Sequence, residues 1–231
     1  MAYVISVANN KGGTGKTTTA INIAAGFCRL VEMSPKVLLI DADAQGTASD
    51  WRNVRPDEPH PFQFVAMRAP TIHSELPGIM DAGTYNYVVI DCPPGGVQDG
   101  QRMARSAIWA SDMVIIPAAP SGFDFWAADP MSRLLEELRT VKPIQVRLLI
   151  NRKVVNTRLG RAAREGAATY AGDIPIFQTE ISQRASIVEA TTNGFTIYEF
   201  EPGGIAAWEY SRLVEEILEC EKQRHSLSQT A

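Results

Sequence analysis

The sequence has few cysteines and histidines, and their scarcity excludes several kinds of site. Its three cysteines, Cys28, Cys92 and Cys220, stand far apart, which argues against a disulfide framework and indicates a reducing compartment. The three histidines form no cluster with them, so a zinc site is not expected. No apolar run approaches the roughly 20 residues that span a bilayer, and no basic segment followed by an apolar run opens the chain. We therefore expect neither a membrane span nor a signal peptide.

The chain also lacks a strong charge of one sign and any linker. Its net charge of −4 over 231 residues does not predict binding to nucleic acid or to a membrane, so any DNA contact must come from a local patch. No Gly/Ser-rich or Pro-rich stretch divides it. We predict one domain over residues 1–224 and a disordered polar tail over residues 225–231.

Short apolar runs alternate with helical patterns along the chain. Strands are expected at residues 3–8, 37–40, 62–66, 87–90, 113–116 and 146–150, and helices at 16–31, 101–110, 123–140, 157–170, 183–192 and 205–224. Near-continuous Val/Ile/Leu runs are typical of parallel strands buried on both faces. The expected fold is α/β, a doubly wound, mostly parallel sheet with helices on both faces and ligands beyond the carboxyl ends of its strands.

The last expected helix carries an apolar set that predicts docking on the core. This set is Trp208, Leu213, Val214, Ile217 and Leu218. Glutamates lie between and beside its members, so an anionic membrane would repel the helix. Binding to a membrane is therefore not expected.

A glycine-rich loop follows the first expected strand and opens a helix. It reads Lys11, Gly12, Gly13, Thr14, Gly15, Lys16, Thr17, Thr18, with Asn10 where the usual phosphate-binding motif begins with glycine. Glycines let backbone N–H groups wrap around phosphates, and the helix N-terminus favours an anion. We expect Lys16 at the β and γ phosphates, the Thr17 hydroxyl on Mg²⁺ and Thr18 at the α phosphate.

The second lysine at the start of this loop carries a family resemblance. Lys11 makes the stretch resemble the deviant Walker A loop of the ParA/MinD ATPases. Looser matches at residues 111–117, 120–125 and 181–184 make the chain resemble most closely the short ParF-like partition proteins. The resemblance extends over roughly residues 1–220 and implies that ATP and Mg²⁺ are the cofactors. It also implies that Lys11 crosses a dimer interface to the partner's nucleotide, where a cation offsets the repulsion between two triphosphates.

Three aspartates at expected strand ends complete the resemblance. Asp41 and Asp43 occupy the family's first switch, in which Ala44 replaces the usual proline. By that match Asp41 helps to organise the Mg²⁺ shell and Asp43 positions the attacking water. Asp91 ends the strand that resembles Walker B and is expected to bind Mg²⁺. A helix N-cap role remains open for Asp41 or Asp43.

Asn151 and Arg152 end the last expected strand beside the predicted nucleotide. Family members carry Asn at this place, which implies that the Asn151 amide contacts the adenine edge, since an amide offers both a donor and an acceptor. The alternative is an ordinary turn residue after a strand.

One region has a basic excess. Residues 151–190 hold six Lys/Arg and four Asp/Glu, whereas residues 195–231 hold three and seven. Arg158, Arg161 and Arg164 recur every third residue on one expected helix, and Lys153 and Arg184 could join them as contacts to DNA phosphates. A merely solvated helix face is the competing interpretation.

Together these features predict a cytoplasmic, nucleoid-associated ATPase of the ParA type. It would dimerise on ATP, bind DNA without sequence preference and partition a plasmid or chromosome region. A ParB-like, centromere-binding or cargo-adaptor protein would stimulate hydrolysis. Alternatives are the positioning of a protein cargo such as a microcompartment, a non-hydrolysing filament or scaffold, and an iron–sulfur ATPase of the nitrogenase type, for which Cys92 is the one cysteine near the predicted interface.

Overall fold

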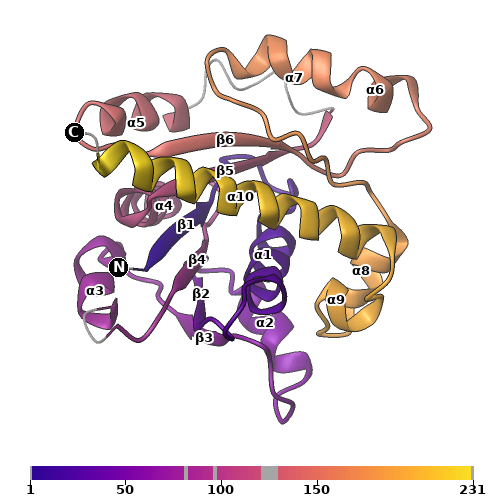
Figure 1. Cartoon of the computed structure of the whole chain (residues 1–231), viewed down its shortest axis with the longest axis horizontal. Helices are drawn as coiled ribbons and strands as arrows, with labels where there is room; N and C mark the ends of the chain where they lie inside the picture. Colours follow the sequence, from indigo (N-terminus) through magenta and orange to yellow (C-terminus); the bar gives the residue numbers. More distant parts are fainter. Residues whose placement is uncertain (1, 81–82, 96–97, 121–129, 230–231) are drawn as a thin grey trace.

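The computed structural model describes residues 2–80, 83–95, 98–120 and 130–229. In this part of the chain the strands form one six-stranded sheet in the order β3-β2-β4-β1-β5-β6, and every pairing is parallel (Figure 1). The strands are β1 Tyr3–Val7, β2 Val37–Asp41, β3 Gln63–Ala66, β4 Tyr87–Asp91, β5 Met113–Ala118 and β6 Gln145–Ile150. All six expected strands and the expected fold class are confirmed.

Helices flank the sheet on both faces (Figure 1). They are α1 Lys16–Leu30, α2 Thr47–Val54, α3 Ile72–Met80, α4 Gln98–Ala110, α5 Pro130–Arg139, α6 Arg158–Arg161, α7 Ala163–Ala171, α8 Ala185–Thr192, α9 Ile197–Phe200 and α10 Ile205–Gln229. Within the described residues none is long and apolar enough to span a bilayer.

Several helical segments differ from expectation. α2, α3 and α9 were not predicted, and the single helix expected over 157–170 is two helices, α6 and α7. α10 runs to Gln229, beyond the expected end at Arg224 and into the segment expected to be a disordered tail. Residues 123–129 of the helix expected over 123–140 lie outside the described residues, and α5 forms the rest.

Each face of the sheet buries its own apolar cluster. One cluster joins the sheet to α1 and α10 and includes Phe27, Val89 and Ile217. The other joins the opposite face to α3 and α4 and includes Leu76 and Ile108. Full burial of one such side chain contributes roughly 1.5–3 kcal/mol. Burial on both faces explains why the central strands lack polar alternation.

The predicted docking face of α10 is correct except for Trp208. Leu213, Val214 and Ile217 are buried and Leu218 packs on the core, whereas Trp208 is 63% exposed. Trp208 therefore does not belong to the docking face.

The parallel sheet brings the functional loops to one edge. β1 lies between β4 and β5, so the loop after β1 emerges near the middle of the sheet. In the β2–β4 pair Asp41 stands opposite Asp91. The phosphate loop and the two switch segments therefore begin side by side.

Candidate functional site

The glycine-rich loop connects β1 to α1 and surrounds the helix N-terminus. Gly13 and Gly15 have φ values of +75° and +85°, a region that residues with a side chain rarely adopt. A Cβ at Gly15 would also lie 2.5 Å from the Asn151 Nδ2 atom. α1 starts at Lys16 without a side-chain cap. Its first N–H groups therefore remain available to an anion.

The two lysines of the loop occupy different environments. Lys16 is buried and its Nζ donates to the Lys11 carbonyl at 3.3 Å. Burial lowers the pKa of Lys16, and the nearby carboxylates of Asp91 and Asp43 oppose this shift. Lys11 is exposed. One cation is thus placed inside the site and the other at its surface.

Asn9 fixes the start of the loop, a role that the sequence did not reveal. This buried residue donates from Nδ2 to the Pro117 carbonyl at 2.8 Å and accepts the Lys11 N–H through Oδ1 at 2.8 Å. It thereby joins the loop to the end of β5. The signal available in the sequence was only an amide directly after an apolar strand.

Asn151 lies against the loop as predicted, but its amide is engaged there. Its Nδ2 donates to the Thr14 carbonyl at 2.8 Å and to the Thr19 hydroxyl at 3.3 Å, and its Oδ1 accepts the Arg152 N–H at 2.9 Å. Arg152 adopts a positive φ of 53° and donates to the Gly13 carbonyl. In this arrangement both residues brace the phosphate loop, and the contact of Asn151 with adenine stays a prediction.

Asp41 is the last residue of β2 and Asp43 lies two residues later, and the two carboxylates have different surroundings. Asp41 is fully buried and accepts hydrogen bonds from the Asp43 N–H at 3.1 Å and from the backbone and hydroxyl of Ser49. The Asp43 carboxylate accepts the Gln45 N–H at 3.0 Å. Asp43 lines the larger of the two cavities described below, whereas Asp41 is not among its lining residues. Asp43 is therefore the better placed of the two to face a ligand.

Asp91 has the environment that a metal-binding carboxylate requires. Among the described residues neither of its buried oxygens has a hydrogen-bond partner. Burial raises the pKa of Asp91 to about 7. The nearby Thr17 hydroxyl opposes this shift, and the Asp41 carboxylate reinforces it. Unsatisfied buried carboxylate oxygens are costly unless a cation or donor meets them. Asp91 and Thr17 therefore fit Mg²⁺, a cation that takes one or two protein oxygens and completes its shell with water and phosphate.

Two adjoining cavities of about 530 Å³ and 480 Å³ meet at the loop. Both are bordered by Gly12, Gly13, Arg152 and Gln183. Among the predicted residues the larger cavity is also lined by Gly15, Lys16, Thr17, Thr18, Asp43, Asn151 and Arg184, and the smaller by Lys11 and Thr14. The predicted loop residues thus converge on a space suited to a nucleotide in size.

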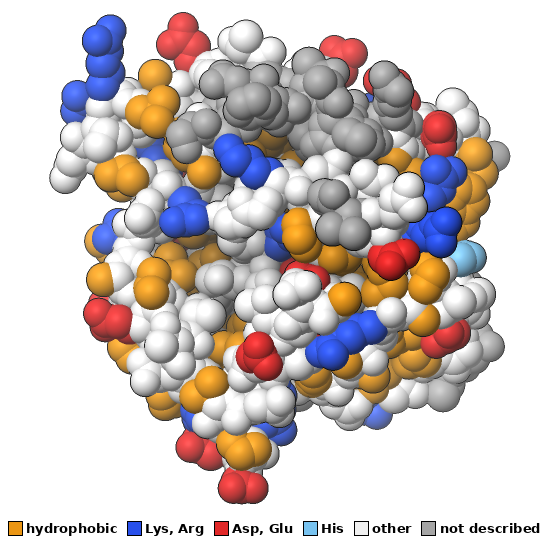
Figure 2. All heavy atoms as spheres, turned by 180° about the vertical axis from the view of Figure 1, so that it is seen from behind, with side chains coloured by type: hydrophobic (Ala, Val, Ile, Leu, Met, Phe, Trp, Pro, Cys, Tyr) orange, Lys and Arg blue, Asp and Glu red, His pale blue; other side chains and the backbone are white. Residues whose placement is uncertain are grey.

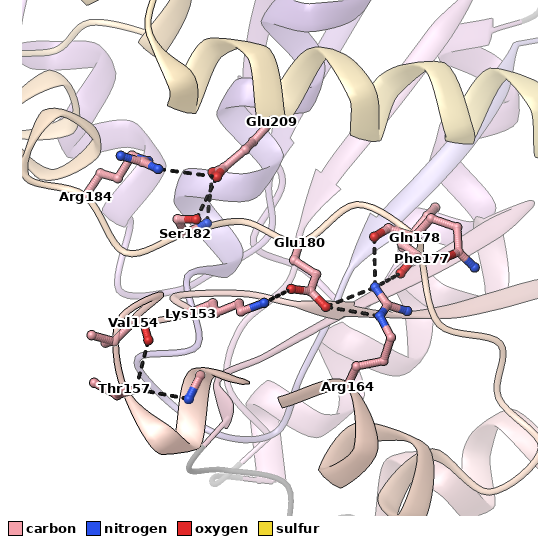
Figure 3. Close-up of polar contacts among 11 residues, drawn as sticks. Lys153, Val154, Thr157, Arg164, Phe177, Gln178, Glu180, Ser182, Arg184 and Glu209 are labelled. Atoms are coloured by element: carbon pink, nitrogen blue, oxygen red, sulfur yellow. Dashed lines mark hydrogen bonds and ion pairs between the residues drawn. The ribbon is translucent and has the colours of Figure 1, made fainter. Parts of the chain in front are cut away.

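The predicted DNA-binding residues do not form one face. Lys153 and Arg164 both point at Glu180, and Arg184 points at Glu209 of α10 (Figure 3). Arg164 also donates to the Phe177 and Gln178 carbonyls at 3.0 Å and 2.8 Å. Arg158 and Arg161 lie exposed on the short α6. The prediction that the three arginines share one helix is therefore wrong, since Arg158 and Arg161 lie on α6 and Arg164 lies on α7, where it pairs with Glu180. Their contact with DNA stays a prediction.

Cys92 does not resemble a cluster ligand. It is fully buried, and burial raises the pKa of its thiol to about 12. A protonated thiol enclosed in the core is a small packing residue. Trp51, on α2 after the first switch, also packs in the core and stacks on Phe62.

Curated relatives match this chain over almost its whole length. The carboxysome distribution protein A of Gloeobacter kilaueensis is 31% identical over 93% of either chain, and that of Halothiobacillus neapolitanus is 27% identical over 94% of this chain and 97% of its own. The chromosome-partitioning ATPase Soj of Thermus thermophilus is 30% identical over 93% of this chain and 94% of its own.

Solved structures share the fold at lower identity. An ATP complex of McdA from Cyanothece has a TM-score of 0.70 at 17% identity, covering 94% of this chain and 96% of that one. Cobyrinic acid a,c-diamide synthase from Mycobacterium smegmatis, with ADP and magnesium, has a TM-score of 0.70 at 18% identity over 96% of either chain. Residues 5–197 match the CobQ/CobB/MinD/ParA nucleotide-binding domain. The chain therefore belongs to this family, and within it to the ParA-like ATPases.

Proposed function

We propose that this chain uses ATP and Mg²⁺ to switch between a single subunit and a DNA-bound dimer that positions a large cargo. The observation that carries the proposal is the placement of two cations on one loop. Lys16 is buried within the site, and Lys11 is exposed at the mouth of the adjoining cavity. A loop built only to hold a nucleotide in its own subunit has no need of the second cation.

The site residues divide the work of hydrolysis. Lys16 and the N-terminus of α1 would hold the phosphates, and Thr17 and Asp91 would hold Mg²⁺, which neutralises charge on the β and γ oxygens. Asp43, at the cavity wall, would orient the attacking water. The presence of Asp43 favours an enzyme over a passive scaffold. The scaffold alternative predicts equal phosphate release from wild type and Asp43→Ala.

Dimerisation follows from the charge of the ligand. Two bound triphosphates repel each other across an interface, and Lys11 from each subunit would offset that repulsion at the partner's site. ATP would then be a condition for pairing.

DNA binding has its best support on α6. The face seen in Figure 2 mixes basic and acidic side chains, as the net charge of −4 implies. A local patch is therefore needed, and Arg158 and Arg161 lie exposed on α6, whose Leu159 and Gly160 border the smaller cavity. A dimer would present this patch twice, which doubles the phosphate contacts and makes DNA binding depend on ATP.

The names of the relatives support two kinds of cargo. Soj and ParA relatives are named for chromosome partition, whereas two relatives with more than nine-tenths coverage are named for carboxysome distribution. The first predicts a plasmid or chromosome region as cargo, and the second predicts a protein body. In either case a partner protein on the cargo would stimulate hydrolysis, and the protein would act in the cytoplasm on the nucleoid.

The nucleotide switch is tested by measuring molar mass and DNA binding with no nucleotide, ADP and a non-hydrolysable ATP analogue. We expect a dimer and binding to duplexes of unrelated sequence only with the analogue. Lys16→Ala should abolish nucleotide binding, whereas Lys11→Ala should retain nucleotide binding and remain monomeric. A wild-type protein that stays a single subunit when saturated with the analogue and Mg²⁺ would contradict the proposal.

The cargo is tested in the source cell. Deletion of the gene should raise the loss rate of a plasmid, raise the fraction of cells without a chromosome, or cluster a fluorescently labelled protein body. The Lys16→Ala variant should reproduce the deletion. A wild-type phenotype in all three readouts would contradict the positioning role.

A further inference from the structure

Asp41 is the point to which the first switch is tied. It ends β2 and is fully buried. One carboxylate oxygen accepts the Asp43 N–H at 3.1 Å, and the other accepts the Ser49 N–H at 3.0 Å together with the Ser49 hydroxyl. The start of the switch and the first turn of α2 therefore share one carboxylate.

Arg68 closes this arrangement from the neighbouring strand. It lies two residues after the end of β3, and the intervening Met67 donates its N–H to the Asp41 carbonyl at 2.9 Å. The Arg68 guanidinium lies 3.6 Å from the Asp41 carboxylate and donates to the Ser49 hydroxyl at 2.9 Å. Asp41 thus balances its buried charge with Arg68 instead of remaining unpaired.

The Arg68 guanidinium also lies against the end of the first switch, at Gly46. Gly46 adopts a φ of +72° and immediately precedes α2. A Cβ at Gly46 would lie 2.6 Å from Arg68 Nη2, so the arginine covers the backbone at this glycine. The segment that carries Asp43 is therefore held at both ends, by Asp41 before it and by Arg68 over Gly46 after it.

The contrast with Asp91 separates two tasks. Asp41 has both oxygens engaged by protein donors, whereas neither oxygen of Asp91 has a hydrogen-bond partner among the described residues. Among the described residues that line the larger cavity, Asp43 is present and Arg68 is absent. Arg68 therefore contacts Asp41 and the backbone at Gly46 but does not line the cavity.

We propose that Arg68 is a positioning residue for ATP hydrolysis, and that Asp41, clamped by Arg68 and Ser49, anchors the first switch in place of serving as a magnesium ligand. The inference rests on the proposed hydrolysis of ATP with Asp43 as the residue that orients water. Orientation errors of about 1 Å reduce turnover by roughly a hundredfold. Loss of the clamp should therefore lower kcat and leave nucleotide and Mg²⁺ affinity nearly unchanged.

The test measures ATP turnover, affinity for a fluorescent ATP analogue and the Mg²⁺ concentration for half-maximal rate. We expect Arg68→Gln to lose roughly ten- to a hundredfold in kcat, with both affinities within about twofold of wild type. Arg68→Lys should retain more activity, because an ammonium preserves the charge beside Asp41. Arg139→Gln, an exposed arginine on α5, is the matched control and should behave as wild type.

Two further variants keep the outcome decisive. If Arg68→Gln fails to fold, Ser49→Ala removes the hydroxyl that links Arg68 to Asp41, preserves the backbone bond and should show the same fall in kcat. Asp41→Asn should lower kcat without raising the half-saturating Mg²⁺ concentration. A many-fold rise in that concentration would overturn the assignment of Asp41.

Asp43→Ala separates failure of the inference from failure of the proposed function. If Asp43→Ala hydrolyses ATP like wild type, the role of Asp43 falls and the inference falls with it. If Asp43→Ala is inactive while Arg68→Gln and Ser49→Ala turn over normally, only the clamp is wrong.

Discussion

Asn10 packs so tightly on Gly95 that a Cβ at Gly95 would lie 1.9 Å from the Asn10 Oδ1 atom. The Gly95 N–H also donates to the Asn10 carbonyl at 3.2 Å. Asn10 occupies the place of the first glycine of the usual phosphate-binding motif. Gly95 ends the Pro93-Pro94-Gly95 segment that follows Asp91, and we interpret this segment as a second switch beside the first. The departure from the motif thus has a function in the structure, because it joins the phosphate loop to that switch.

This contact predicts a reciprocal pair of variants. Gly95→Ala should force the Asn10 side chain away and slow ATP turnover by roughly tenfold or more, because the second switch loses its fixed distance from the loop. Asn10→Gly should restore much of the loss when combined with Gly95→Ala, since it removes the clash. The measurement is phosphate release by the two single variants and the double variant. Additive effects of the two changes would contradict direct coupling.

Glu180 predicts a gain of DNA affinity. It pairs with both Lys153 and Arg164, so Glu180→Gln should release two cations toward DNA phosphates. Two added phosphate contacts would steepen the slope of log affinity against log salt by up to about 1.8. The measurement is binding of the ATP-bound protein to duplex DNA between low and moderate salt.

The matched control removes the same charge without releasing a partner. Glu165 on α7 is exposed and has no ion pair in the described part of the chain. Glu165→Gln should change affinity slightly and leave the salt slope unaltered. Equal slopes for Glu180→Gln and Glu165→Gln would show that Lys153 and Arg164 do not reach DNA.

The carboxyl of Asp91 predicts a pH dependence of stability in the magnesium-free protein. Folding raises its pKa from 3.8 to about 7, so the folded state binds its proton more tightly than the unfolded state does. Its stabilising effect is therefore complete below about pH 4 and is lost as the pH rises through 7. The loss is on the order of 4 kcal/mol.

Asp91→Asn isolates this effect from other titrating groups. An amide does not ionise, so the Asn variant should be more stable than wild type at pH 8 and should show a smaller decline between pH 5 and pH 8. The measurement is the denaturation midpoint in urea at several pH values with a chelator present. Parallel pH profiles for the two proteins would mean that Asp91 ionises without penalty.

Asn151 provides a test of base recognition against loop support. Asn151→Ala removes the donor from the Thr14 carbonyl and should destabilise the protein by about 1–3 kcal/mol. If Asn151 acts only as a brace, affinities for ATP and GTP should fall by the same factor. A selective loss of ATP affinity would support the predicted contact with adenine. Fluorescent analogues of both nucleotides measure the two constants.

The sequence predicted the sheet because each strand carries its own apolar run, and the four central strands β2, β4, β1 and β5 are buried on both faces. It did not predict α9, although Thr196 and Glu199 form a capping box that a closer reading could have found. α3 was not predicted because it contains Pro77, and proline usually ends a helix. The division between α6 and α7 at Ala162 carries no Pro or Gly that would have marked it in the sequence.

In the candidate site, too, residues close together in sequence were predicted, whereas residues that act through distant partners were not. The glycines and lysines of the phosphate loop are local in sequence, so their spacing was sufficient to identify them. Asn9 and Arg68 act through partners more than 25 residues away, Pro117 and Asp41, and no spacing rule connects them. The state of a carboxylate is equally remote, because only the packed structure shows that Asp41 is paired while Asp91 is not.

The hydrogen bond from Lys16 to the Lys11 carbonyl links the inner cation to the backbone of the outer one. A triphosphate that draws the Lys16 ammonium toward itself must take it from that carbonyl. Binding of the nucleotide would then also release the Lys11 carbonyl from this hydrogen bond. Nucleotide binding inside the pocket would therefore be coupled directly to Lys11 at the surface of the subunit.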